Sequence, residues 1–373
     1  MKIAVLANLK KNAPTWEGIA EDHWDDLDSP KTIEAIMNAL RANGHTAEFF
    51  EAQITPPYSL IEKLTDYAPD LCFNIAESHY GESREAQIPA VLDALRMPYT
   101  GSQVLNLTLS LDKPMTKRIL HYHNLPTPEF QVFEKADDPI DSDLLDEAGE
   151  LRFPLFVKPS REGTSIGVDA RSIVHTVAEL YDVVAEQLQR YRQPILVEHF
   201  IEGRELTVGV VGNLGRTAAR RLNDREALDE LPATMTFLPV LEIDLEAYDD
   251  SEAGIYTNRM KTDLVDEFYY HCPALIDNAL VQQLNLLAAA VFRVTGCRDV
   301  ARVDFRLDKT TGSPYILEVN PLPGLNPDYS DLCIQANAAG WTYEQLIGAI
   351  TDQALGRYSL LTETVTNPGT AIG

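Results

Sequence analysis

"ARVDFRLDKTTGSPYILEVNPLPGL" (301–325) reads as two strands joined by the loop "DKTTGS", with a Pro-Leu-Pro-Gly turn that ends the second strand. Alternation along the first strand puts apolar side chains on one face and charged ones on the other, namely Val303, Phe305 and Leu307 against Arg302, Asp304 and Arg306. In the second strand it opposes Tyr315, Leu317 and Val319 to Ile316, Glu318 and Asn320. A hairpin centred on Thr311 makes Asp304 and Glu318 direct cross-strand neighbours and sets Arg302 opposite Asn320.

Two carboxylates that face each other on a sheet repel unless a cation lies between them. Asp304, Glu318 and Asn320 are hard oxygen donors, and no His or Cys lies nearby in the sequence. This donor set favours Mg²⁺ or Mn²⁺ over zinc, and such ions usually also bind substrate phosphates. The alternative is that Arg302 and Arg306 neutralise the two acids in an ion-pair network.

The composition bounds the class of protein. The chain has 373 residues, 45% of them hydrophobic and 24% charged, which predicts a globular protein of two or three domains. A formal net charge of -26 argues against a nucleic-acid partner. We interpret the acidic blocks 21–28 and 137–147 as solvated surface. No apolar stretch is long enough for a membrane span, so no membrane association is expected.

The cysteines and the first residues indicate the compartment. Four separated cysteines form no C-x-x-C pair, which is typical of reduced thiols. The start of the chain lacks the apolar segment of a signal peptide. We expect a cytoplasmic protein, and we expect it to be a homodimer.

The first hundred residues alternate apolar runs with amphipathic ones. Strands are predicted at 3–7, 47–52 and 70–76, and helices at 30–43, 59–66 and 85–96. This order predicts a parallel sheet. The chain lacks a G-x-G-x-x-G motif after the first strand, which argues against a dinucleotide-dependent dehydrogenase.

The middle of the chain carries a second chemical motif. Asp112 caps a predicted helix with Pro114 in its first turn, and short strands are predicted at 154–160 and 195–201 around a helix at 176–192. "FVKPSREGTSIGV" (156–168) places Lys158 at a strand end before a glycine-containing loop. Such a loop can fold over phosphates, although it is not a Walker A loop. The alternative is an exposed surface loop. Further on, 205–221 predicts a hairpin around Asn213, and 279–294 predicts a helix.

Five segments in this order and at these separations resemble the ATP-grasp enzymes, and in particular the D-alanine–D-alanine ligase family: "LDKPMTK", "FPLFVKPSREGTSIGV", "ILVEHFIEGREL", "ARVDFRLD" and "ILEVNPLPGL". "GESREAQIPAVLDALRMPYTGS" (81–102) extends the likeness, which covers most of the chain from about residue 70. The resemblance implies an α/β fold, with α+β character in the nucleotide-binding part and a parallel-sheet N-terminal domain. It implies three domains, 1–110, 111–202 and 203–373, with ATP between the second and the third.

The resemblance also implies roles for individual residues. On the nucleotide side, Lys113 and Lys158 match phosphate-contacting lysines, Glu198, His199 and Ile201 match the adenine-proximal strand, and Glu205 matches a ribose-binding acid. Asp304, Glu318 and Asn320 match the magnesium ligands. Arg302 and the backbone of Gly324 match the group that stabilises a tetrahedral oxyanion. Thr164 or Ser165 takes the place of the loop serine that closes over the reactants.

The departures from the family pattern concern the amino-acid pocket. The stretch after the first strand lacks the family's glycine-rich turn and its glutamate, and Glu77 stands where many members have a histidine. Lys261 falls one position from an expected lysine, with Tyr256 nearby. Tyr329 occupies the position of a serine that holds the second carboxylate, and Ser330 follows it.

Three functions are compatible with these residues. The first is an ATP-dependent carboxylate–amine ligase that joins amino acids through an acyl phosphate, with a divergent amino-acid pocket. The second is an authentic D-alanine–D-alanine ligase of cell-wall synthesis. The third is an ATP-binding sensor without turnover, which the retained metal-ligand positions and Arg302 argue against.

Overall fold

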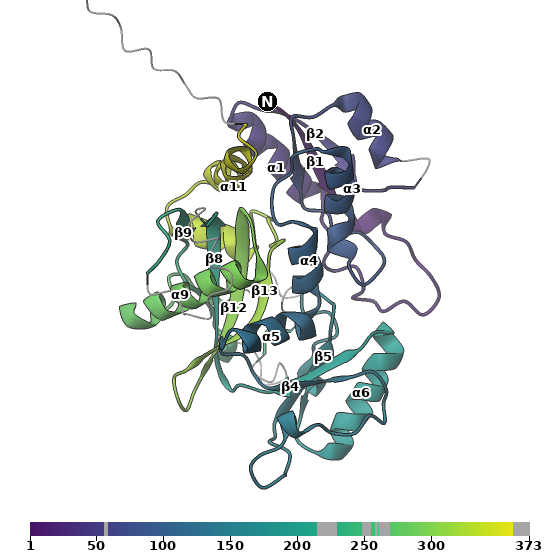
Figure 1. The fold of residues 1–373 in the computed structure, drawn as a ribbon, viewed down its shortest axis with the longest axis vertical. Coiled ribbons are helices and arrows are strands. Elements are labelled where there is room, and N and C mark those ends of the chain that lie inside the picture. Colours follow the sequence, from purple (N-terminus) through teal and green to yellow (C-terminus); the bar gives the residue numbers. More distant parts are fainter. Residues whose placement is uncertain (56–58, 215–229, 248–254, 258–259, 261–268, 361–373) are drawn as a thin grey trace, which may run out of the picture.

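The computed structural model describes residues 1–55, 59–214, 230–247, 255–257, 260 and 269–360 (Figure 1). These residues form three sheets. The N-terminal sheet and the sheet of the central segment lie towards opposite ends of the long axis, with the largest sheet between them (Figure 1). Within the described part of the chain, no helix combines the length and the apolar character that crossing a bilayer requires.

The N-terminal sheet is parallel and has the order β2-β1-β3. Its strands are β1 (Lys2–Ala7), β2 (Thr46–Glu51) and β3 (Leu71–Asn74), and its helices are α1 (Pro30–Ala42), α2 (Leu60–Tyr67) and α3 (Gln87–Leu95). Ser29 caps α1 by accepting a hydrogen bond from the Thr32 N–H. All six elements were predicted from the sequence, with ends that differ by at most two residues. The parallel sheet is confirmed.

The central segment forms an antiparallel sheet of order β4-β7-β5-β6. Its elements are β4 (Phe130–Phe133), β5 (Leu155–Pro159), β6 (Ile173–Val174), α6 (Val177–Tyr191) and β7 (Ile195–His199). The apolar face of α6 packs on this sheet through Leu180 and Val184, which are fully buried.

The largest sheet has the strand order β11-β10-β8-β12-β13. A sixth strand, β9, also pairs with β8. Its elements are β8 (Gly203–Gly212), β9 (Met235–Phe237), β10 (Leu241–Ile243), β11 (Tyr270–His271), β12 (Val300–Asp308) and β13 (Pro314–Asn320). Helix α9 (Asn278–Thr295) covers one face of the sheet and supplies much of its core, including Leu284 and Phe292. The other face carries polar side chains towards the cavities described below.

The β12–β13 hairpin has the predicted register. Arg302 pairs with Asn320 and Asp304 with Glu318, but the register shifts by one residue beyond Asp304. This irregularity breaks the alternation in β13, so the predicted placement of Ile316 on the polar face is wrong. Ile316 is fully buried in the core beside Val319.

The remaining α-helices of the described residues join the sheets. They are α4 (Val104–Leu111), α5 (Lys113–Tyr122), α10 (Asp331–Ala338) and α11 (Tyr343–Arg357). The Asp112 carboxylate accepts from the Met115 N–H, which confirms the predicted cap of α5. Helix α11 packs against α1, so the end of the described chain lies on the N-terminal sheet (Figure 1). Arg357 of α11 reaches the fully buried Asp299 at 2.7 Å.

Two predictions about the surface and the turns need correction. Strand β8 pairs with 235–237 rather than with the residues directly after Asn213, and 215–221 lie outside the described residues. The acidic block 137–147 is mostly exposed, as predicted. The block 21–28 is not solvated surface, because the side chains of Asp25 and Asp26 are 8% and 6% exposed. All four cysteines are free, as predicted.

Candidate active site

Two adjoining cavities lie between the three sheets. The larger, of about 400 Å³, is bounded by the N-terminal segment, the loop at 162–164 and the turn after β13. The smaller, of about 90 Å³, lies between the β5–β7 side of the central sheet and the polar face of β8, β12 and β13. Six residues line both cavities: Lys113, Glu162, Tyr256, Arg302, Glu318 and Asp331. The cavities therefore meet around these side chains.

The smaller cavity has a buried charge cluster in one wall. The Glu198 carboxylate lies 2.6 Å from Lys158 Nζ and 2.7 Å from Lys117 Nζ. Burial opposes ionisation of Glu198, but the two ammonium groups outweigh it and lower its pKa. Burial lowers the pKa of Lys117 to about 8 despite the attraction of Glu198. Lys158 lines the cavity, and Lys117 lies behind it against Thr127.

The other predicted nucleotide-side residues also line the smaller cavity. Apolar and aromatic side chains, Phe156, Phe200, Ile201 and Leu317, form much of its surface. His199 is buried, and its Nε2 lies 3.4 Å from the carbonyl oxygen of Leu144. Glu205 pairs with Arg306 at 3.0 Å. The smaller cavity therefore combines apolar and aromatic walls with charged side chains at its edge.

Asp304 is the centre of a buried hydrogen-bond network. Arg302 donates to both of its oxygens at 2.9 and 2.8 Å, and the Thr207 hydroxyl donates to one at 2.7 Å. The Asn320 amide donates to Asp304 at 2.8 Å, and Arg302 also reaches Asp331 at 3.1 Å. The ion-pair alternative therefore describes Asp304 in this structure. The donor set of Asp304, Glu318 and Asn320 nevertheless fits a hard cation, since three oxygen-bearing side chains gather at one strand end.

Glu318 lies where the two cavities meet. Its carboxylate is 3.4 Å from Lys113 Nζ, and its side chain is 27% exposed. Lys113 also donates to the carbonyl oxygen of Glu162 in the loop after β5. Lys113 and Lys158, both predicted to contact phosphates, thus line the same cavity.

The loop after β5 is folded over the cavities. Thr164 lines the larger cavity and Ser165 the smaller, and both have positive φ angles of 47° and 53°. The Ser165 hydroxyl donates to the carbonyl oxygen of Tyr256 at 2.9 Å. Gly167 has φ 77°, and a Cβ there would lie 2.7 Å from Pro159, so glycine is required. Lys261 lies outside the described residues.

The N-terminal segment 21–28 fastens this loop. Asp22 accepts hydrogen bonds from the Gly167 N–H at 3.0 Å and from the Tyr191 hydroxyl at 3.0 Å. Asp26 pairs with Arg84 at 2.6 Å, and Arg84 donates to the carbonyl oxygen of Arg161. The loop therefore has a docked position that depends on residues far away in the sequence.

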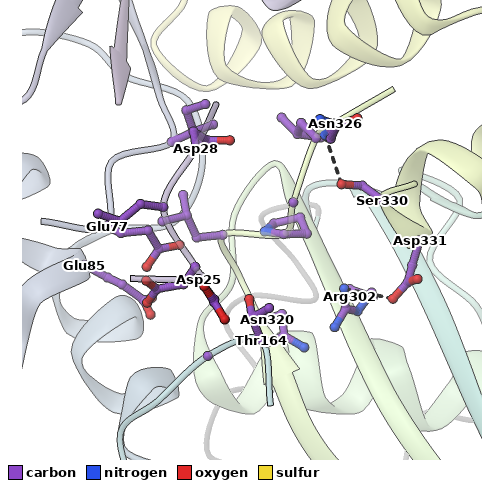
Figure 2. Close-up of a pocket in the computed structure, with 18 of the residues that line it drawn as sticks. Asp25, Asp28, Glu77, Glu85, Thr164, Arg302, Asn320, Asn326, Ser330 and Asp331 are labelled. Carbon is purple, nitrogen blue, oxygen red and sulfur yellow. Dashed lines mark hydrogen bonds and ion pairs between the residues drawn. The ribbon is translucent and has the colours of Figure 1, made fainter. Parts of the chain in front are cut away.

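The far wall of the larger cavity is acidic. Asp25, Asp26, Asp28, Glu77 and Glu85 all line it, and Figure 2 shows Asp28, Glu77 and Glu85 across the cavity from Arg302. Burial, with help from Asp26, raises the pKa of Asp28 to about 7. Burial raises the pKa of Glu85 to about 7 as well, although Arg84 opposes the rise. Burial and the neighbouring Glu85 raise the pKa of Glu77.

The turn after β13 and the start of α10 form the opposite wall. Ser330 accepts from the Asn326 N–H at 2.9 Å, and a Cβ at Gly324 would lie 2.9 Å from its hydroxyl oxygen (Figure 2). Tyr329 also lines the cavity but is 44% exposed. Ser330 lines the same cavity, so both predicted residues, Tyr329 and Ser330, border it.

Sequence reasoning missed several of these residues. The acids Asp25, Asp26 and Asp28 follow no periodic pattern and lie in a loop, so composition alone suggested surface. Lys117 follows Lys113 by one helical turn, a spacing that places both on one face of α5. Asp331 gave a weaker signal as an acid in the first turn of a helix.

The chain is similar to known proteins over most of its length. Residues 119–228 and 233–352 match the family model described as the D-ala D-ala ligase C-terminus. A D-alanine–D-alanine ligase of Pelotomaculum thermopropionicum is 32% identical over 337 residues, covering 88% of this chain and 92% of the relative. An uncharacterized protein, y4sG, of Sinorhizobium fredii is 34% identical over 336 residues, covering 88% of each chain.

A solved structure shares the fold. The D-alanine–D-alanine ligase of Bacillus anthracis complexed with ATP superposes with a TM-score of 0.67 at 22% identity, covering 96% of this chain and 99% of that one. The match to the family model spans well over half of the chain. The fold, the family model and the curated relatives agree, and the chain belongs to the D-alanine–D-alanine ligase family of ATP-grasp proteins.

Proposed function

We propose that the protein couples two amino acids in an ATP-dependent reaction through an acyl phosphate, and that its preferred pair is not two D-alanines. Membership of the family supports an ATP-dependent ligase that forms a peptide bond. The observation that carries the proposal is the meeting of the two cavities at Lys113, Arg302 and Glu318. There a phosphate held from one side can meet a carboxylate held from the other.

The smaller cavity is the proposed nucleotide site. Phe156, Phe200, Ile201 and Leu317 would contact the purine, the strand end at Glu198 and His199 would lie beside it, and Glu205 would accept from the ribose. Lys113 and Lys158 would bind the phosphates. Asp304, Glu318 and Asn320 would hold Mg²⁺ or Mn²⁺, which would neutralise phosphate charge and orient the transferred group. Arg302 would then lose one of its two hydrogen bonds to Asp304, which would free a carboxylate oxygen for the metal.

The proposed reaction has two steps, and both take place where the two cavities meet. A substrate carboxylate oxygen attacks the γ-phosphorus, its bond to ADP breaks, and an acyl phosphate forms. The neutral amine of the second substrate attacks the acyl carbon, the C–O bond to phosphate breaks, and the nitrogen loses one proton to the departing phosphate, which leaves the amide. Arg302 and the backbone N–H of Gly324 would stabilise the oxyanion that forms during attack. Thr164 and Ser165 close the site, which excludes water from the acyl phosphate.

The larger cavity, which is the proposed amino-acid site, favours a divergent pocket at its acidic wall. It argues against divergence at the opposite wall, which contains Ser330. Ser330 lines the larger cavity and would supply a hydroxyl to the second carboxylate, so the tyrosine at position 329 carries less weight than its place in the sequence indicates. At the other end, Glu77 does not act alone, since four further acids line the same wall. We therefore propose that the amino-acid pocket differs from the family pattern at its acidic wall. A homodimer and a cytoplasmic location remain predictions.

The direct test is ADP release from magnesium-ATP with a panel of D- and L-amino acids, singly and in pairs. Stimulation by pairs supports a ligase, and mass spectrometry of the product identifies the bond. ATP binding without ADP release for any pair would favour the sensor. Preferred formation of D-alanyl-D-alanine would favour the authentic D-alanine–D-alanine ligase.

A further inference from the structure

The larger cavity has more carboxyl groups in its lining than an ordinary α-ammonium group requires. Among its lining acids, Asp25 pairs with Lys10, Glu318 with Lys113 and Asp331 with Arg302. Among the described residues, the carboxylates of Asp28, Glu77 and Glu85 form no ion pair or hydrogen bond. These three side chains stand together on one wall (Figure 2).

A second observation points to a ligand at this wall. The side chain of Asp26 is 94% buried, since only 6% of it is exposed, and one of its oxygens bonds to Arg84 at 2.6 Å. Its other oxygen, Oδ1, is buried and has no hydrogen-bond partner among the described residues. An unsatisfied carboxylate oxygen beside an acidic wall is costly, and a cationic donor would relieve both costs.

The geometry of the wall argues against a metal as that cation. No group of three His, Cys, Asp or Glu side chains in the described part of the chain is arranged to hold a metal ion. An organic cation needs no such convergence, because its donors can reach carboxylates several ångströms apart. The cavity volume of about 400 Å³ also falls within the range of small-molecule sites.

We infer that one substrate is an amino acid with a cationic side chain, whose second positive charge lies against Glu77, Glu85 and Asp28. This inference rests on the proposed function, because it takes the larger cavity as the amino-acid site. The substrate carboxylate faces Arg302 and Gly324, and its two cationic groups face the acidic wall. Alanine would satisfy one acid of this wall and leave the others uncompensated.

The test compares lysine with norleucine, which has a side chain of the same carbon length without the ammonium group. Both enantiomers of each are titrated by calorimetry into the full chain with magnesium and a non-hydrolysable ATP analogue. One enantiomer of lysine is expected to bind roughly ten- to a hundredfold more tightly than its norleucine counterpart. Equal affinity, or tighter binding of norleucine, overturns the inference.

Variants locate the effect. Glu77→Gln/Glu85→Gln should remove most of the preference for lysine, because lysine loses contacts for two positive charges and norleucine for only one, and Glu62→Gln on the exposed face of α2 is the matched control. The substitutions at Glu77 and Glu85 keep the side-chain volume and remove charges that repel each other, so we expect the double variant to fold. Retention of the full preference in the double variant also overturns the inference.

ADP release separates this inference from the proposed function. If only pairs of uncharged amino acids stimulate ADP release, the ligase function holds and the inference fails. If lysine binds selectively but no pair stimulates release, the cationic site holds and the ligase function fails.

Discussion

The two cavities differ in how their acids are compensated. In the smaller one, each buried acid has a cation of the protein beside it: Glu198 has Lys117 and Lys158, Glu205 has Arg306, and Asp304 has Arg302. On the far wall of the larger one, Asp28, Glu77 and Glu85 share the raised pKa values of acids that lack such support. The acids of the smaller cavity are thus balanced by cations of the protein, whereas we infer that a cationic ligand balances those of the far wall.

The largest expected effect lies where the two regions meet. Glu318→Gln keeps the shape of the side chain but removes a charge that lies 3.4 Å from Lys113. We expect the turnover number to fall roughly 10²- to 10³-fold, because phosphate, metal and acyl charge all depend on this position. Steady-state ADP release at several magnesium concentrations measures it. Glu202→Gln, outside both cavities, is the control, and near-normal activity of Glu318→Gln at limiting magnesium would refute the metal assignment.

The two lysines on Glu198 provide a comparison within the nucleotide side. Lys158→Met removes the cation that lines the cavity and should raise the KM for ATP about tenfold or more. Lys117→Met leaves Glu198 its bond to Lys158, so it should lower stability by about 1–3 kcal/mol with little effect on that KM. Denaturant unfolding and kinetics of both variants test this. Equal KM values in the two variants would contradict the distinction.

Proteolysis of the loop 160–167 tests whether Asp22 in the N-terminal segment holds this loop in its docked position. Asp22→Asn weakens the hold of Asp22 on Gly167 and Tyr191, so proteolysis within 160–167 should become a few times faster without nucleotide. Saturating ATP should slow cleavage in both the variant and the unchanged protein. Cleavage that ATP does not alter would argue against a lid.

The smallest effect is on stability. The pKa of Asp28 is raised to about 7 in the folded state, so the folded protein binds a proton that the unfolded chain has lost above pH 4. The stability contribution of this group is therefore lost as pH rises from about 4 to about 7. Asp28→Asn should be more stable than the unchanged protein at pH 8, and the gain should shrink at pH 5, where the folded protein binds the proton. A gain independent of pH would contradict this.

The sequence could predict features that depend on neighbouring residues, but not those that depend on residues far away in the chain. Strand alternation and a hairpin loop were sufficient to pair Asp304 with Glu318, because local geometry fixes cross-strand neighbours. The burial of Ile316 was missed because an irregularity in the hairpin has no reliable sequence signal. The acids at 25–28 were missed because their burial depends on Arg84 and on the loop around Gly167, which lie more than fifty residues away.

The most direct test of the central claim is product formation across pairs of D- and L-amino acids with magnesium-ATP, followed by mass spectrometry and ADP release. We expect one pair that contains a lysine-like amino acid to give the highest kcat/KM, with one ADP and one phosphate released per peptide bond. Preference for two D-alanines over every other pair would contradict the claim that this member of the family has a different amino-acid site.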